Sequence, residues 1–270
     1  MGYFTIVRPL NCLLAFISVL IGAWAGKEIF LSSSLIIAGF VGIFVAISGN
    51  IINDIKDIEI DRINNPERPL VSGRVKKNVA WIMSLTSAGL AIIFGFGLGN
   101  RPFLLIILAL ILLYLYSFYF KKMLIANFII AFVSGLSFVL GGIVVKNPLV
   151  LFPFLFALFI HLAREVVKDI IDIEGDRNVR VKSLPIILGS FNAQRIAIIS
   201  LILLLIIIPL PFLLHLFSLS YIIIALLGIY PMIIYIIINL CRRLSWSELK
   251  RTSSLLKTSM AIGLVALALS

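Results

Sequence analysis

The chain has 270 residues, 61% of them apolar, and a formal net charge of +11. Soluble domains average about 45–50% apolar residues, so this composition excludes an ordinary water-exposed fold. The positive charge alone would suggest a nucleic-acid partner, but the distribution of the basic residues along the chain explains the charge without one.

Apolar runs of membrane-spanning length, about 20 residues each, recur along the whole chain. Each must form an α-helix, because lipid-exposed backbone has to satisfy its own hydrogen bonds. The first run leads directly into further spans, which is typical of a transmembrane helix and not of a cleaved signal peptide. The last run is short and the last three are crowded, so eight or ten helices stay open as alternatives to nine. The nine predicted spans are 10–27, 35–53, 79–99, 102–120, 124–145, 149–168, 194–214, 217–240 and 255–270.

The segments between the predicted spans differ in charge. With nine spans and the N-terminus in the cytoplasm, only Lys27, Arg101 and Lys146 of the 23 basic residues fall on the outer side. Cytoplasmic loops of membrane proteins carry an excess of lysine and arginine, so this distribution explains the positive charge. Two long loops, near 54–78 and 171–193, also fall on the inner side. We therefore expect a cell-membrane protein whose N-terminus and functional site face the cytoplasm.

The acidic residues are concentrated in two short stretches of similar sequence. All of the 12 acidic residues except Glu28 and Glu248 lie in or beside NDIKDIEIDR (53–62) and KDIIDIEGDR (168–177). The two stretches are identical at seven of ten positions, at a constant offset of 115 residues. Such similarity predicts an internal repeat.

The repeat has a defined orientation. The second stretch ends a span four crossings after the first, so both copies face the same side of the membrane. The sequence therefore predicts an all-α polytopic membrane protein that forms a single domain over residues 1–270. In it, two parallel four-helix repeats, 1–122 and 123–240, and an extra helix at 255–270 surround a central cavity.

Each acidic stretch carries aspartates at relative positions 0, 3 and 7, which a helix places on one face. Carboxylates gathered in this way repel one another and are costly near lipid, and a divalent cation relieves both effects. Mg²⁺ usually binds one or two carboxylates together with substrate phosphates, so two facing clusters predict a magnesium–diphosphate site. Ordinary helix-end charges are the alternative, but that interpretation leaves the repeat unexplained. The predicted metal ligands are Asn53, Asp54, Asp57, Asp61, Asp169, Asp172 and Asp176.

Further polar residues near the inner face are candidates for substrate contacts. Arg68 stands between Pro66 and Pro69 and is the arginine best placed to donate to a phosphate. Inner-face basic anchors and the aromatic belt are the alternative for most of the others, and hydrogen bonding between helices is the alternative for Asn11 and His161. The predicted substrate-binding residues are Arg8, Asn11, Asn50, Asn53, Arg62, Arg68, Tyr119, Lys122, His161 and Lys168. The predicted catalytic residues are Asp57, Asp61, Tyr116, Lys121, Asp172 and Asp176.

With these motifs the chain resembles the UbiA superfamily of intramembrane prenyltransferases over essentially its whole length. NDIKDIEID (53–61) and DIIDIEGD (169–176) are similar to the two aspartate-rich motifs of that family, and NNPERPLVSG (64–73) is similar to the loop after the first motif. The resemblance implies nine transmembrane helices and Mg²⁺-dependent prenyl transfer. The aspartates would hold an isoprenyl diphosphate through the metal, the tail would lie among apolar helices, and the acceptor would attack the allylic cation.

One motif departs from the family pattern. The family has a tyrosine followed four residues later by a lysine after its fourth helix. Here Lys121 follows Tyr116 by five residues, and Lys122 follows Tyr119 by three. Which tyrosine and lysine bind the diphosphate is therefore left open.

Within the family, the chain most resembles the archaeal enzymes that transfer a geranylgeranyl group to geranylgeranylglyceryl phosphate, forming the second ether of the archaeal membrane lipid. An aromatic or quinone-precursor acceptor is the alternative, and the residues themselves do not decide between them. A divalent-cation transporter is an alternative of another class, although transport would place acids near the bilayer midplane. The expected partners are an isoprenyl diphosphate, a lipid-like acceptor, Mg²⁺ and membrane lipids, with no nucleic acid.

Overall fold

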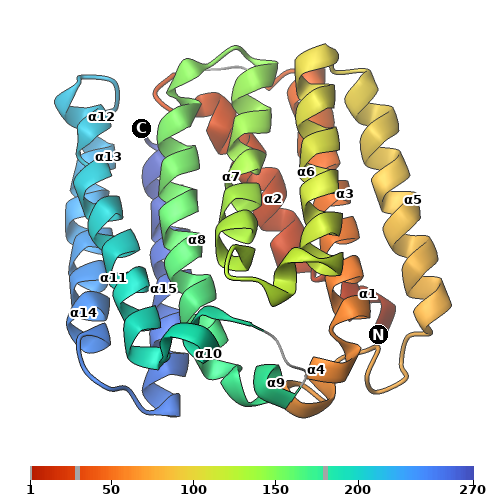
Figure 1. Ribbon diagram of the computed structural model, residues 1–270. Helices are drawn as coiled ribbons and strands as arrows, with labels where there is room; N and C mark the ends of the chain where they lie inside the picture. Colours follow the sequence, from red (N-terminus) through yellow and green to blue (C-terminus); the bar gives the residue numbers. More distant parts are fainter. Residues whose placement is uncertain (1, 28–30, 179–181) are drawn as a thin grey trace.

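Long helices stand side by side in the structure, a computed structural model that describes residues 2–27, 31–178 and 182–270. The two chain ends lie at opposite ends of this bundle (Figure 1). Within those described ranges all regular structure is helical, with a π segment at Ala225–Ile229 and 3-10 turns at Phe120–Lys122 and Pro148–Val150. The α-helices are α1 Gly2–Val7, α2 Pro9–Trp24, α3 Ser33–Lys56, α4 Ile58–Asn64, α5 Lys77–Phe96, α6 Asn100–Phe118, α7 Ala126–Val144, α8 Leu151–Ile171, α9 Ile173–Asn178, α10 Leu184–Leu188, α11 Ser190–Ile207, α12 Leu210–Leu213, α13 Leu219–Ile224, α14 Tyr230–Leu240 and α15 Trp246–Ala268.

In the described part of the chain, eight helical segments are long and apolar enough to cross a membrane. They overlap the first eight predicted spans, and the chain is a multi-pass membrane protein. α15 is comparably long, at 23 residues, but Lys250, Arg251 and Lys257 make its first half polar. It packs along α8 and α14 (Figure 1). A ninth membrane crossing stays a prediction.

The start of α15 differs from the predicted start of the ninth span at 255. The main-chain N–H of Ser245 donates to the Glu248 carboxylate at 2.8 Å, and the main-chain N–H of Glu248 donates to Ser245 Oγ at 3.4 Å. This capping box satisfies main-chain donors that a helix start leaves without partners. Hydropathy misses the beginning of the helix because its first turns are polar.

α2 and α7 approach so closely that their main chains are in contact. A Cβ atom added to Gly22 of α2 would lie 2.0 Å from the carbonyl oxygen of Phe138 on α7. A Cβ atom added to Gly141 of α7 would lie 1.8 Å from the carbonyl oxygen of Val19 on α2. Only glycine fits at these positions, as in other membrane bundles where small residues let helices touch. We call this contact the α2–α7 seam.

The two acidic stretches end helices that occupy similar places in the bundle. α3 packs against α2 and α5, and α8 packs against α7 and α11. Behind α8, apolar side chains of α11, α14 and α15 form a continuous core that includes Leu201, Ile236 and Leu256. The order of neighbours is therefore the same in both parts of the chain, and the division into the repeats 1–122 and 123–240 stays a prediction.

Candidate active site

Both acidic stretches lie at one end of the bundle, which we call the aspartate end (Figure 1). Asp57 (φ −91°, ψ 0°) separates α3 from α4, and Asp172 (φ −91°, ψ 8°) separates α8 from α9. The predicted single helical face is therefore interrupted at the middle aspartate of each stretch. The main chain of each of these aspartates is still bonded to the helix that follows, because the Asp57 carbonyl accepts from the Asp61 N–H at 2.8 Å and the Asp172 carbonyl accepts from the Asp176 N–H at 3.1 Å.

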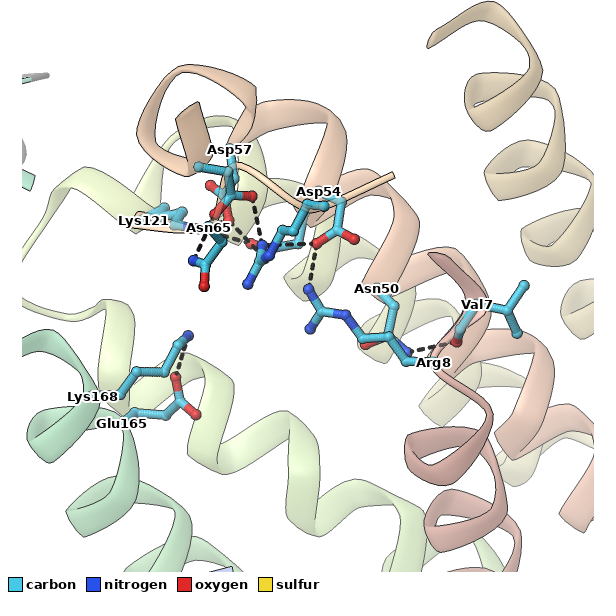
Figure 2. Close-up of polar contacts among 12 residues, drawn as sticks. Val7, Arg8, Asn50, Asp54, Asp57, Asn65, Lys121, Glu165 and Lys168 are labelled. Atoms are coloured by element: carbon cyan, nitrogen blue, oxygen red, sulfur yellow. Dashed lines mark hydrogen bonds and ion pairs between the residues drawn. The ribbon is translucent and has the colours of Figure 1, made fainter. Parts of the chain in front are cut away.

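The first cluster consists of Asp54, Asp57 and Asp61. Each of the three is at most 5% exposed. Arg68 Nη1 lies 3.1 Å from Asp54 Oδ1 and 2.6 Å from Asp61 Oδ2, and Arg8 also pairs with Asp54 (Figure 2). The main-chain N–H of Arg68 donates to the Asn65 carbonyl at 3.1 Å, so a turn after α4 positions this arginine. The cluster thus receives cations from both the N-terminal segment and the loop after α4.

Lys121 neutralises the middle carboxylate of the first cluster. It lies in the turn after α6, pairs with Asp57 and donates to Asn53 Oδ1 at 3.1 Å. Asn53 Nδ2 in turn donates to Asp57 Oδ2 at 2.9 Å. Asp57 Oδ1 is buried and has no hydrogen-bond partner in the described part of the chain. Because a buried carboxylate oxygen without a partner is costly, this atom favours the approach of a cation or of a ligand donor.

The second cluster consists of Asp169, Asp172 and Asp176. Its neighbour Glu165 takes the cations that α8 supplies: Arg164 Nη1 lies 2.7 Å from one carboxylate oxygen and Lys168 Nζ lies 3.4 Å from the other. Among the described residues, no ion pair within 4.0 Å reaches Asp172 or Asp176. Three cations balance the first cluster, whereas no ion pair within the described residues reaches the second.

Burial makes the charged form of the carboxylates at the aspartate end energetically unfavourable. Burial raises the pKa of Asp61, although the Arg68 guanidinium acts to lower it. Burial likewise raises the pKa of Asp172 and of Asp176. Desolvation favours the neutral form of an acid, and a bound cation favours the charged form. These groups therefore gain from a divalent cation.

The two clusters face each other across the aspartate end. α4 packs against α9, and Asn64 Nδ2 donates to the main-chain carbonyl of Asp172 at 3.4 Å. Arg68 and Lys121 contact the first cluster, and their positive charges also favour the charged form of Asp172. Figure 2 shows Glu165 and Lys168 extending from α8 into the space that the first cluster faces. A ligand at this end can therefore contact both clusters.

Several predicted site residues lie at the clusters. Tyr116 is buried at the end of α6, within reach of the charges of Asp57, Asp169 and Asp176. Tyr116 and Lys121 thus both lie near the two clusters. The other predicted residues in contact with an acidic residue of either stretch are Arg8, Asn53, Arg68 and Lys168.

Other predicted residues lie apart from the carboxylates. Asn50 donates to the main-chain carbonyl of Val7 at 3.3 Å and so ties α3 to α1 (Figure 2). His161 is half-buried on α8, one turn before Glu165. The side chain of Lys122 lies outside the described part of the structure. Exposed residues whose predicted role in substrate binding stays a prediction are Asn11, Arg62 and Tyr119.

Three polar residues at the site were absent from the predicted set. Asn65 Nδ2 donates to Asp61 Oδ1 at 3.2 Å, and Asn64 joins the two clusters. Their signal is the NNP sequence after the first acidic stretch, where asparagines precede a proline that ends the helix. Glu165 gathers two cations, and its signal is an acid within an apolar span, which is rare unless it is paired.

The carboxylate oxygens at the aspartate end suit a metal ion that is also coordinated by a bound substrate. Among the described residues, no group of three or more histidine, cysteine, aspartate or glutamate side chains could hold a metal ion by itself. Mg²⁺ does not need such a group, because it usually takes one or two carboxylates and completes its shell with water and phosphate oxygens. The free Oδ1 of Asp57 and the unpaired carboxylates of Asp172 and Asp176 provide oxygen ligands of this kind. The residues therefore fit Mg²⁺ held jointly with a phosphorylated substrate.

Known proteins of related sequence cover nearly the whole chain. A digeranylgeranylglyceryl phosphate synthase of Methanosphaera stadtmanae is 36% identical over 99% of this chain and 98% of its own length. The corresponding synthase of Methanocaldococcus jannaschii is 37% identical over 98% of this chain and 94% of its own length. The profile of the UbiA prenyltransferase family matches residues 15–255.

Solved structures share the fold. The structure of a digeranylgeranylglyceryl phosphate synthase superposes with a TM-score of 0.81 at 35% identity, over 99% of this chain and 96% of that chain. A UbiA homologue from Archaeoglobus fulgidus bound to DMAPP and Mg²⁺ superposes with a TM-score of 0.70 at 19% identity, over 97% of this chain and 99% of that one. The helical bundle, the two facing aspartate clusters and the match over residues 15–255 agree, and the chain belongs to the UbiA prenyltransferase family.

Proposed function

We propose that this membrane prenyltransferase transfers a geranylgeranyl group from its diphosphate to geranylgeranylglyceryl phosphate, forming the second ether of the archaeal membrane lipid. The observation that carries the proposal is the near full-length identity of 36% to a digeranylgeranylglyceryl phosphate synthase. Two facing aspartate clusters with adjacent cations support the diphosphate half of the reaction. The resemblance to the synthases supports the acceptor half.

The diphosphate is proposed to bind between the clusters. Arg68 and Lys121 each donate to carboxylates of the first cluster and are within reach to donate to phosphate oxygens, as charge-assisted donors do. Asp57, Asp172 and Asp176 would hold Mg²⁺. When bound, Mg²⁺ neutralises the charge that develops on the departing diphosphate. Tyr116, buried near both clusters, would donate a hydrogen bond from its hydroxyl to the same leaving group.

The apolar helices are proposed to hold the prenyl chain away from water. In the reaction the carbon–oxygen bond to the diphosphate breaks, and the acceptor hydroxyl forms an ether bond to the same allylic carbon and loses its proton. Water would compete with the acceptor for the allylic cation, so a site walled by membrane-embedded helices protects it. The ends of α3, α6 and α8 at the aspartate end carry buried residues and would form part of this wall.

The aspartate end is proposed to face the cytoplasm of the cell. The basic residues of the chain lie mostly in the connections at this end, which agrees with the excess of lysine and arginine in cytoplasmic loops. The diphosphate group of an isoprenyl diphosphate is charged and water-soluble. A site that faces the cytoplasm would therefore be directly accessible to it.

The proposal is tested with purified protein, Mg²⁺ and geranylgeranyl diphosphate. Geranylgeranylglyceryl phosphate and 4-hydroxybenzoate are offered in separate reactions, and products are identified by mass spectrometry. We expect an ether product from the glyceryl phosphate, and its loss in Asp57→Ala and Asp172→Ala and after chelation of the metal. Prenylation of the aromatic acid alone would overturn the acceptor assignment. Metal uptake into proteoliposomes without prenyl transfer would overturn the enzymatic one.

A further inference from the structure

A second feature of the aspartate end is a large cavity that extends away from the first cluster. It has a volume of about 1270 Å³ and reaches from Arg68 and Asn65, past the end of α8, to α15. It is walled mainly by α8, α11 and α15, and it adjoins the diphosphate site, with which it shares Arg68 and Asp172. The basic side chains that line it beyond Arg68 are Arg164, Lys168, Arg243, Lys250 and Lys257.

Three of these cations converge from two helices. Arg164 and Lys168 lie one turn apart on α8, and their charges act on Lys257 of α15. Glu165 is the carboxylate that pairs with Arg164 and Lys168. No ion pair within 4.0 Å reaches Lys257 from the residues that the structure describes. Like charges that face each other around a cavity repel, and an anion between them removes that repulsion.

Arg164 has unused hydrogen-bonding capacity at this cavity. Its Nη1 donates to Glu165 at 2.7 Å, but its Nε is buried without a partner among the described residues. A guanidinium presents its donors as a planar fork, which matches phosphate oxygens. Leaving a buried donor unsatisfied is costly. The cavity therefore offers both the charge and the donors of a phosphate site.

We propose that this cavity binds the phosphate monoester of the prenyl acceptor, with Arg164, Lys168 and Lys257 as its ligands. The inference rests on the proposed function, in which one substrate brings a diphosphate and the other a single phosphate. Arg68 and Asp172 line the cavity and also belong to the diphosphate site. A phosphate held at Arg164 would therefore leave the glycerol hydroxyl on the side of the aspartate clusters. An anionic phospholipid headgroup has the same chemistry and is distinguished by the experiment.

The test compares Lys257→Gln with Lys77→Gln, an exposed lysine at the start of α5. Each variant is assayed with geranylgeranylglyceryl phosphate and with the same acceptor lacking its phosphate. We expect Lys257→Gln to raise the KM for the phosphorylated acceptor about tenfold, the effect of one charge-assisted hydrogen bond. The KM for the dephosphorylated acceptor and for geranylgeranyl diphosphate should stay unchanged, and Lys77→Gln should behave as the unsubstituted protein. Equal effects on both acceptors, or an effect on the diphosphate KM, would overturn the assignment.

The lipid alternative is separated by repeating the comparison in vesicles of neutral lipid and of anionic lipid. A Lys257 effect that depends on the anionic lipid and not on the acceptor phosphate assigns the cavity to a membrane lipid. Glycerol 1-phosphate serves as a probe of the unsubstituted protein and so does not depend on the folding of a variant. Inhibition competitive with the acceptor supports the inference, and no inhibition, or competition with the diphosphate, contradicts it. If Lys257→Gln forms the ether with an unchanged KM for the acceptor, the assignment of this cavity is rejected and the proposed function stands. If the unsubstituted protein forms no ether product, the proposed function itself is rejected.

Discussion

Asp57 and Asp172 hold the same place in the main chain, 115 residues apart: each ends a long helix, with φ −91° and ψ near 0°. Their surroundings nevertheless differ. Lys121 and Asn53 contact the carboxylate of Asp57, whereas no ion pair reaches Asp172 in the described part of the chain. The same backbone feature therefore carries an ion-paired carboxylate at Asp57 and, within the described residues, a carboxylate without an ion pair at Asp172.

Replacing either middle aspartate by asparagine is expected to abolish most of the activity. Asp57→Asn and Asp172→Asn keep the size of the side chain but remove the charge that a cation needs. We expect kcat/KM to fall by about 10²–10³, the usual effect of losing one electrostatic contact to a leaving group. Steady-state assays at saturating Mg²⁺ measure this loss. Glu59→Gln is the matched control, because Glu59 is an exposed acid within the first acidic stretch, and a similar loss in that variant would contradict the prediction.

Lys121 is expected to act on the binding of the diphosphate. Lys121→Gln removes the cation that pairs with Asp57 and should raise the KM for the prenyl diphosphate by about 10–100-fold. Lys56→Gln serves as the control, because Lys56 precedes Asp57 directly but is exposed and lies over the Phe118 ring at 3.5 Å. A wild-type KM in Lys121→Gln would show that another cation holds the diphosphate.

The charge on Asp172 is expected to cost stability in the metal-free protein. Because burial raises its pKa above the ordinary value of 3.8, the folded state binds more protons than the unfolded state between these two values. The free energy of unfolding therefore falls as pH rises through this window, and the full cost remains at neutral pH. Asp172→Asn should accordingly melt at a higher temperature than the unsubstituted protein at pH 7, and this advantage should shrink on acidification toward pH 4.

Thermal melts in detergent with a chelator present measure this effect. Added Mg²⁺ should raise the melting temperature of the unsubstituted protein more than that of Asp172→Asn, since ligand binding to the folded state stabilises it. A lower melting temperature of Asp172→Asn at pH 7 would mean that the carboxylate is satisfied without a metal.

The α2–α7 seam is expected to be intolerant of a methyl group. Gly141→Ala places a Cβ 1.8 Å from the Val19 carbonyl oxygen, so the helices must separate, at a cost of about 1–3 kcal/mol or more. Gly89→Ala in α5 is the control, since a Cβ there meets nothing within 4 Å. That substitution should stabilise the helix by about 0.5–1 kcal/mol. Urea or thermal unfolding in detergent compares the two, and equal stabilities would show that the seam relaxes freely.

The sequence was sufficient to predict the spans and the acidic clusters, because both depend on local composition. Hydropathy located eight spans, and the similarity of the two stretches placed them at one end of the bundle. It could not show that the helices are interrupted at Asp57 and Asp172, because no proline or glycine marks Asp57. The contacts of Arg8 and Lys121 with the first cluster could not be predicted from the sequence either. They depend on how the N-terminal segment and the turn after α6 fold back on α3, which are long-range relationships.

The glycines of the α2–α7 seam have a consequence for how the protein can move. Carrier proteins that rock one bundle against another need an interface whose surfaces slide past each other. Here main-chain atoms of the two helices interlock at Gly22 and Gly141, so the bundle is a frame of set width. We therefore expect substrate entry and product release to involve the short segments at the aspartate end, α4, α9 and α10, while the contact between α2 and α7 is kept.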